Sequence, residues 1–143
     1  MEFKLLRRIP FLSTLPERDL RRVYKIARET GLAAGQAIFT KAEAADHMFI
    51  VVSGRVKIFT RSASKKRKTF AYLKKGDFFG EMGLLEGLPR SASASAVEPS
   101  RLLILRKADF KRLLISDPKL AYFLLQTVCA RLRRANEEIE GLL

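Results

Sequence analysis

The chain has 143 residues, 48% of them hydrophobic, and a formal net charge of +13 at pH 7. This length suits one domain with a substantial core, and the charge would suit a polyanionic partner. No apolar run reaches the roughly 20 residues of a membrane-spanning helix, and "MEFKLLRRIPFL" lacks the apolar core of a secretory signal, so we expect a soluble, cytoplasmic protein.

Residues 1–34 are predicted to form a helical lead-in. Pro16 suits the first turn of a helix, and apolar residues recur at helical spacing over residues 20–27. Gly31 is expected to end this helix. The result is a short amphipathic helix that packs against the rest of the domain.

Residues 35–106 are predicted to form an antiparallel β-sandwich or barrel. Six short β-rich runs are separated by turn signals: "AIFT", "HMFIVV", "RVKIFT", "TFAYL", "SASASAV" and "SRLLILR". Residues 55–75 carry nine basic residues and no acidic one. Their "KKRK" cluster is predicted to be the solvated tip of a hairpin, with a nucleic-acid or effector contact as the alternative.

Residues 107–143 are predicted to be helical, with Pro118 able to start the last helix. Six apolar residues in that helix follow one another at intervals of 3, 4, 3, 4 and 3, as in a coiled coil: Leu125, Val128, Leu132, Ala135, Ile139 and Leu142. We therefore expect a homodimer formed by this helix. Packing of the helix on its own domain is the alternative.

The single cysteine, Cys129, excludes an intrachain disulfide, and its apolar neighbours favour a buried or half-buried side chain. The single histidine, His47, cannot build the multi-histidine metal cluster of a catalytic β-barrel. Neither a G-x-S-x-G elbow nor a phosphate-binding Walker loop occurs. We expect no enzymatic activity and no metal.

Residues 76–92 combine a glycine-rich bend with the acid Glu81 and a single basic residue, Arg90. A short helical turn is expected over residues 82–85, and its free N–H groups favour an anion. Arg90 can add a charged fork of donors, whereas Glu81 can accept hydrogen bonds from sugar hydroxyls. One ligand with a phosphate and a ribose would use both groups. A structural salt bridge between Glu81 and Arg90 is the alternative.

The small residues after Arg90 alternate between serine and alanine. In a strand, Ser91, Ser93 and Ser95 would lie on one face, and the alanines of residues 92–96 on the other. Small side chains on the inner face would leave room inside a barrel.

The stretch "GDFFGEMGLLEGLPRSASA" resembles the phosphate-binding cassette of cyclic nucleotide-binding domains, which regulate catabolite activator proteins, kinases and channels. "DHMFIVVSGRVKIF" resembles the central strands of that family, and "IPFLSTLPERDLRRV" its helical lead-in. The resemblance implies an eight-stranded jelly-roll-like β-barrel with an N-terminal helix, a short cassette helix and a long C-terminal helix.

The same resemblance implies which residues bind the ligand. Gly80 and Glu81 would hold the ribose 2′-hydroxyl, and Arg90 would hold a phosphate oxygen. In the transcription-factor branch the base is reached from the long C-terminal helix, where Asn136 stands in the position of a serine and Ala135 in that of a threonine. The candidate ligand-binding residues are Gly80, Glu81, Met82, Arg90, Ser91, Ala92 and Asn136. The expected ligand is cAMP, with cGMP as the alternative.

Two departures from the family pattern matter. Ala42 stands where the family commonly has a glycine in a turn, and that turn is expected to lie away from the cassette. The family's transcription factors continue into a helix-turn-helix, whereas this sequence ends at Leu143, so we expect a sensor without its own DNA-binding helix, either an excised domain or a stand-alone module that reports to another protein. The alternative is a module that keeps the fold without the ligand and acts as a scaffold or binds nucleic acid.

Overall fold

Eight strands form the centre of the computed structural model, which describes residues 1–61 and 67–143. The strands are β1 (Arg28–Leu32), β2 (Ala37–Phe39), β3 (His47–Ser53), β4 (Arg55–Arg61), β5 (Arg67–Lys74), β6 (Phe78–Phe79), β7 (Ser93–Ala96) and β8 (Ser100–Arg106). They build two antiparallel sheets, with strand orders β1-β8-β3-β6 and β2-β7-β4-β5. The predicted strands and the jelly-roll-like fold are confirmed.

The expected barrel is not closed in the described part of the chain, because its strands hydrogen-bond as two separate sheets. Strands β4 and β5 pair along their whole length, as a hairpin requires. Part of the "KKRK" cluster that we expected at its tip lies within residues 62–66, outside the described residues, while Arg67 and Lys68 belong to β5.

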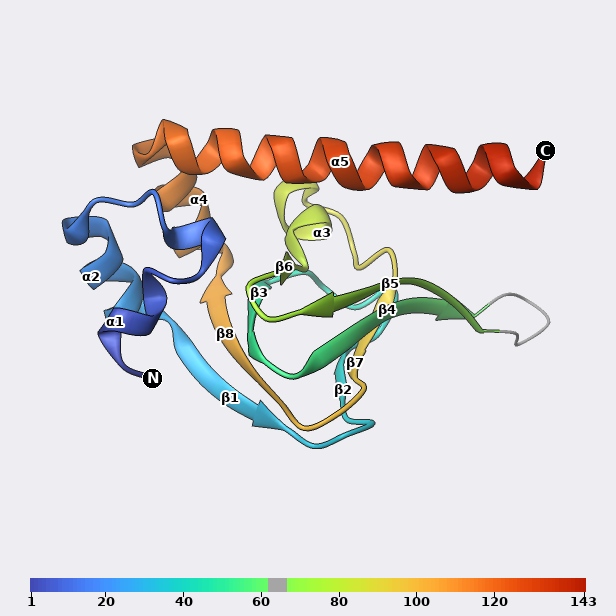
Figure 1. Cartoon of the computed structure of the whole chain (residues 1–143), viewed down its shortest axis with the longest axis horizontal. Coiled ribbons are helices and arrows are strands. Elements are labelled where there is room, and N and C mark those ends of the chain that lie inside the picture. The colour runs from blue at the N-terminus through green and yellow to red at the C-terminus, as the bar shows by residue number, and fades with distance from the viewer. Residues whose placement is uncertain (62–66) are drawn as a thin grey trace.

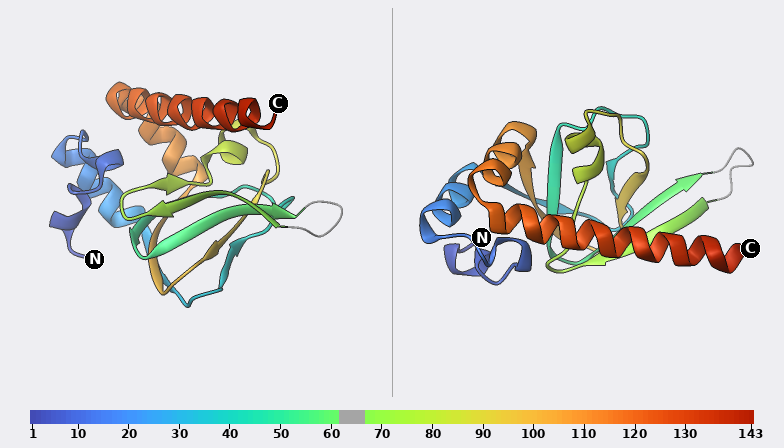
Figure 2. Two further views of the ribbon diagram at one scale, coloured as in Figure 1. Left: turned by 45° about the vertical axis from the view of Figure 1, so that its right-hand side comes forward. Right: turned by 90° about the horizontal axis from the view of Figure 1, so that it is seen from above.

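The helices lie at one end and along one side of the sheets (Figures 1 and 2). They are α1 (Phe3–Leu6), the 3₁₀ turn η1 (Pro10–Leu12), α2 (Glu17–Ile26), the cassette helix α3 (Glu81–Glu86), α4 (Lys107–Ser116) and α5 (Pro118–Leu142). The N-terminal helices and α4 cover one end of the molecule, and α5 runs along the side on which α3 lies.

The prediction that Gly31 ends the first long helix is wrong. Helix α2 stops at Ile26, and Gly31 lies inside strand β1. Every residue of β1 pairs with β8, from Arg28 opposite Ile104 to Leu32 opposite Ser100. The backbone hydrogen bonds between β1 and β8 stabilise the extended conformation of these residues, so the helix does not continue to Gly31.

Two apolar clusters hold the elements together. In the first, Phe11 of η1 packs on Phe78 of β6 and Phe110 of α4, with ring centroids 4.7 and 6.0 Å away. In the second, between the sheets, Phe79 stacks on Phe49 with centroids 5.1 Å apart. Neighbouring residues of a strand point to opposite faces, so the two-residue strand β6 joins both clusters.

Strand β7 shows the predicted alternation of serine and alanine. Ala94 and Ala96 face the core, each only 1% exposed. Their cross-strand partners are Ile58 and Val56, while Ser95 is paired with Lys57 on the opposite face. The small alanines leave room beside the aromatic rings between the sheets.

Helix α5 is fixed at its start. Pro118 takes the first helical position, as predicted, and the Asp117 carboxylate accepts hydrogen bonds from the backbone N–H groups of Lys119 and Leu120, at 3.1 Å each. Leu120 and Leu124 are buried in the first cluster. This capped and packed first third anchors the helix to the domain.

Beyond Val128, which still packs on the core, α5 is largely exposed. The prediction of a buried or half-buried Cys129 is wrong, because this side chain is exposed on the part of α5 that extends beyond the core. Of the predicted seam, Leu125, Leu132 and Ile139 are 61%, 60% and 56% exposed. They follow one another every seven residues and therefore share one face of the helix.

The turn between β3 and β4 should tolerate no side chain at Gly54. This residue has a φ of +91°, and an added Cβ would lie 2.2 Å from Ser100 Oγ and 2.6 Å from the Pro99 carbonyl oxygen. We expect Gly54→Ala to lower the free energy of unfolding by about 2–4 kcal/mol, from backbone strain plus the clash.

Gly35→Ala is the matched control, since Gly35 has a φ of +83° but no atom within 4 Å of an added Cβ. It should cost only the strain of about 1–2 kcal/mol. Urea denaturation measures both values, and equal losses would contradict the role of the clash.

Candidate ligand-binding site

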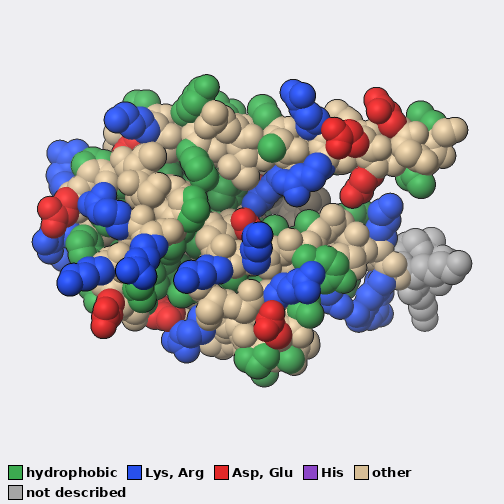
Figure 3. Space-filling view, in the orientation of Figure 1, with side chains coloured by type: hydrophobic (Ala, Val, Ile, Leu, Met, Phe, Trp, Pro, Cys, Tyr) green, Lys and Arg blue, Asp and Glu red, His purple; other side chains and the backbone are tan. Residues whose placement is uncertain are grey.

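A hollow of about 760 Å³ lies between the second sheet, the cassette and α5. Its walls come from β4 and β5, from residues 79–83 and 90–92 of the cassette, and from one strip of α5. Figure 3 shows the recess beneath α5, with Lys, Arg, Asp and Glu side chains around it. Segments that are far apart in the sequence therefore form one site.

The cassette helix α3 starts at a glycine with a left-handed backbone. Gly80 has a φ of +83°, and a Cβ there would lie 3.0 Å from Arg90 Nη1 and 3.0 Å from a ring carbon of Phe49. A side chain at this position would be strained and would press on the arginine. Glycine thus allows the cassette to approach the Arg90 guanidinium closely.

Arg90 is buried, with only 6% of its surface exposed, and lines the hollow. Its guanidinium donates to the carbonyl oxygens of Gly80 and His47, the latter at 2.6 Å. The guanidinium lies 4.2 Å from the ring centroid of Phe39 and 5.7 Å from that of Phe49. Burial lowers the pKa of Arg90, and the nearby Asp46, Glu43 and Glu81 oppose that shift.

The turn around Ala42 holds the backbone of Arg90. The Ala42 N–H donates to the Arg90 carbonyl oxygen at 2.9 Å, and the Arg90 N–H donates to the Glu43 carbonyl oxygen at 2.8 Å. The expectation that this turn lies away from the cassette is therefore wrong. Ala42 adopts a φ of +79°, which explains why a glycine suits the position.

Glu81, only 4% exposed, pairs with an arginine of α5 rather than with Arg90. Its Oε1 accepts from Nη1 of Arg131 at 3.2 Å, while the other Arg131 nitrogen donates to the Phe78 carbonyl oxygen. Among the described residues no ion pair within 4.0 Å joins Glu81 to Arg90. The structural salt bridge that the sequence left as an alternative is therefore not formed. Burial raises the pKa of Glu81, and the charges of Arg131 and Arg90 oppose the rise.

Arg131 is the polar group that sequence reasoning missed. The strip of α5 that faces the hollow consists of Thr127, Arg131, Arg134, Ala135 and Glu138. Their spacing of three and four residues is that of one helix face, so the periodicity contained the signal. The coiled-coil prediction used the periodicity of the apolar residues in this helix and not that of the polar ones.

The hollow brings together six of the seven candidate residues: Gly80, Glu81, Met82, Arg90, Ser91 and Ala92. Met82 and Ser91 are exposed at its mouth, whereas Ala92 is buried. Asn136 is exposed on α5 and does not line the hollow of its own chain. Ala135, its neighbour, does.

The arrangement suits a ligand with an anionic group at one end and hydroxyl groups at the other. Arg90 supplies a fixed positive charge near the anion-favouring start of the cassette, and Glu81 with Arg131 supplies an acceptor and a donor. Within the described residues no cluster of His, Cys, Asp or Glu could hold a metal ion. None of the helices there is long and apolar enough to cross a membrane.

The raised pKa of Glu81 should make stability depend on pH. Because folding raises this pKa above its ordinary value of 4.5, the folded state favours the protonated acid, and the free energy of unfolding falls as pH rises through the folded pKa. Glu81→Gln mimics the protonated form. We therefore expect this variant to become more stable relative to the unchanged protein as pH rises from 4.5 through the folded pKa of Glu81.

Thermal unfolding in ligand-free buffers of increasing pH measures this difference. The same change at Glu86, an exposed residue at the end of α3, is the control. If the difference in stability between Glu81→Gln and the unchanged protein stays constant with pH, the raised pKa of Glu81 is contradicted.

Comparison with known proteins shows which family the fold belongs to. The family model for the cyclic nucleotide-binding domain matches residues 29–117. The cyclic AMP receptor protein of Thermus thermophilus is 37% identical over 108 residues, which cover 76% of this chain and 50% of the receptor. A cyclic nucleotide-gated potassium channel of Rhizobium etli is 34% identical over 129 residues, which cover 90% of this chain and 35% of the channel.

Among solved structures, the catabolite activator protein of Thermus thermophilus superposes with a TM-score of 0.81 at 32% identity, covering 93% of this chain and 62% of that one. The chain thus spans about half of one of these curated relatives and about a third of the other. The family model includes the whole cassette and both sheets almost completely. This chain belongs to the cyclic nucleotide-binding domain family.

Proposed function

We propose that this chain binds cAMP in the hollow and acts as a sensor that does not change its ligand chemically. The observation that carries the proposal is the Arg90 guanidinium. It is buried at the wall of the hollow, and no carboxylate within 4.0 Å pairs with it among the described residues. Its Nε has no hydrogen-bond partner there. A buried cation of this kind favours an anionic ligand, here the cyclic phosphate.

The other cassette residues suit the rest of the nucleotide. Ser91 and Ala92 lie next to Arg90 and can hold the phosphate through a hydroxyl and a backbone N–H. Glu81 can accept a hydrogen bond from the ribose 2′-hydroxyl. Adenine would lie against α5, near Ala135. The name of the Thermus relative, a cyclic AMP receptor, supports cAMP over cGMP as the ligand.

Ligand binding would be reported through Arg131. This side chain ties α5 to Glu81 and to the Phe78 carbonyl oxygen, and its guanidinium lies 4.5 Å from the Phe78 ring centroid. A ribose hydroxyl that binds Glu81 competes with Arg131 for the same carboxylate. Occupancy would then shift the population of α5 positions, which is how a domain without catalytic groups transmits a signal.

The exposed face of α5 supports a homodimer as part of this function. Leu125, Leu132 and Ile139 form a stripe on the described surface, whereas Val128 packs on the core and Ala135 faces the hollow. Two copies that pair along this stripe would bury it. Each α5 would then touch both its own ligand site and the partner helix, so that ligand binding and helix position are linked.

Replacing Arg90 by Leu should weaken cAMP binding at least about tenfold, because charge-assisted hydrogen bonds to the phosphate are lost. Isothermal titration calorimetry measures the affinity. Arg112→Leu is the matched control, since the Arg112 side chain is 66% exposed on α4 and lies outside the hollow. Circular dichroism checks that both variants fold. An unchanged affinity in a folded Arg90→Leu protein would refute the proposal that Arg90 binds the phosphate.

Replacing Leu132 by Glu should convert the dimer to a monomer, because a charge would then stand in the middle of the apolar stripe. Sedimentation velocity measures the oligomeric state. Ile115→Glu is the control, since Ile115 is 84% exposed but belongs to α4. A monomeric unchanged protein, or a dimeric Leu132→Glu protein, would refute the helix-paired dimer.

A further inference from the structure

A second groove, of about 490 Å³, lies on the outer face of the sheet whose inner face borders the hollow. Alternation along β4 separates the two faces. Ile58 belongs to the hollow, while Lys57 and Phe59 belong to the groove. The part of the groove at Lys57 and Phe59 is therefore separated from the cassette by the thickness of the sheet, whereas Tyr72 on the edge strand β5 lines both the groove and the hollow.

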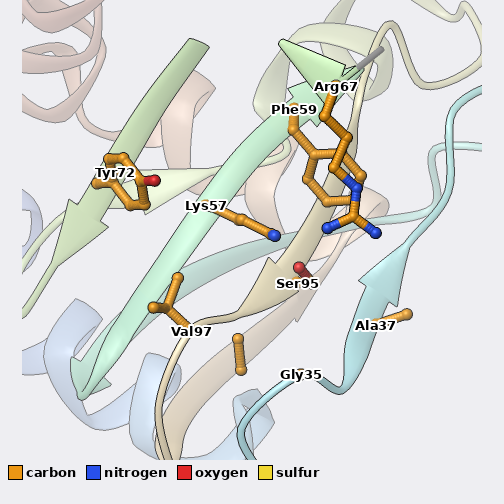
Figure 4. A pocket seen from close by; sticks show the side chains of 9 residues that line it. Gly35, Ala37, Lys57, Phe59, Arg67, Tyr72, Ser95 and Val97 are labelled. Atoms are coloured by element: carbon orange, nitrogen blue, oxygen red, sulfur yellow. The ribbon is translucent and has the colours of Figure 1, made fainter. Parts of the chain in front are cut away.

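Two cations share one aromatic ring in this groove. The Lys57 ammonium lies 4.9 Å and the Arg67 guanidinium 5.0 Å from the ring centroid of Phe59. In the described part of the chain neither cation has a carboxylate within 4.0 Å. Figure 4 shows both cationic groups directed toward the same region, near the Ser95 hydroxyl. Like charges repel, so this arrangement favours an anion between them.

Small side chains leave space beside these cations. Ser95 stands opposite Lys57 on one side and Ala37 on the other, and Gly35 follows at the end of the groove. Ser95 is only 7% exposed, so its hydroxyl lies at the bottom of the groove. A guanidinium, an ammonium and a hydroxyl together supply the donors that phosphate oxygens require.

An aromatic ring stands on the far side of Lys57. Tyr72, paired with Lys57 across the strands, is 53% exposed, and the Arg55 guanidinium lies 4.5 Å from its ring centroid. A planar group attached to the phosphate could stack on the exposed part of this ring. The volume of the groove lies within the range of roughly 300–1,000 Å³ that small-ligand sites have.

We propose that this groove binds the phosphate group of a small phosphorylated molecule that also carries a planar ring. A phosphate monoester has a charge of about −1.5 to −2 at pH 7, which matches Lys57 and Arg67 together better than one carboxylate would. The donors lie around Ser95, and the ring position is at Tyr72. The phosphate position at Lys57 and Arg67 is separate from the cassette and does not depend on the cyclic-nucleotide proposal.

The first test is a titration of the unchanged, ¹⁵N-labelled protein with adenosine 5′-monophosphate, followed by two-dimensional NMR. We expect saturable shifts of the amide signals of Lys57, Arg67 and Ser95, and no shift of these signals with adenosine, which lacks the phosphate. Signals of Gly80 and Arg90 report the cassette separately. Shifts confined to the cassette, or equal shifts with adenosine, would overturn the proposal.

The second test compares single charge removals on one strand. Arg67→Gln should weaken binding at the groove about tenfold, because two charge-assisted hydrogen bonds are lost. Lys68→Gln removes the same charge at the next residue of β5, which does not line the groove, and should leave the affinity unchanged. Equal losses in both variants would show attraction by the general charge of the surface and would refute a defined site.

A last comparison distinguishes a small molecule from a polymer that carries the same phosphate chemistry. Oligothymidylate of ten nucleotides is titrated under the same conditions. Binding at the groove amides much tighter than that of the monophosphate, with a steep dependence on salt, would overturn the proposal in favour of single-stranded nucleic acid.

Discussion

The buried guanidinium of Arg90 is the constraint on which the site depends. Taking a charged group out of water is costly unless hydrogen bonds and favourable charges replace the lost hydration. Here the Gly80 and His47 carbonyl oxygens and the faces of Phe39 and Phe49 do so. Because His47 starts strand β3 and Gly80 directly precedes helix α3, one side chain holds the cassette against the first sheet.

The hollow is consequently assembled from parts with unequal freedom. The cassette is held by Arg90 and by its backbone hydrogen bonds to the turn at Ala42 and Glu43. The wall formed by α5 is held near the cassette by the contacts of Arg131 to Glu81 and Phe78. Those contacts all come from one side chain of α5, whereas several hydrogen bonds hold the cassette.

Local patterns in the sequence were sufficient for most of the fold. Six strand runs, the cassette turn and the start of α5 at Pro118 were predicted from alternation, glycines and helix signals, and the structure confirms them. Gly31 was misassigned because its conformation is decided by pairing with β8, about 70 residues away in the chain, which no local pattern contains.

In the site, too, contacts between residues close in sequence were predicted, whereas contacts between distant segments were not. Residues within the cassette lie close in sequence, so their convergence was predictable from spacing and from the family resemblance. Arg131 pairs with Glu81 across 50 residues, and the contact of the Ala42 turn with Arg90 spans 48 positions in the chain, so both needed the folded structure. Cys129 looked buried because its neighbours are apolar, but α5 leaves the core at that point and exposes it.

The way α5 is attached gives it the mechanics of a lever. Its 25 residues correspond to a rod about 37 Å long, fixed at the Asp117 end by the cap and by Leu120 and Leu124. Arg131 lies about halfway along the rod. For a rigid rod of this length, a tilt of about 5° at the fixed end displaces the other end by about 3 Å. A small tilt at the anchored end would therefore become a displacement of a few ångströms at the far end of α5.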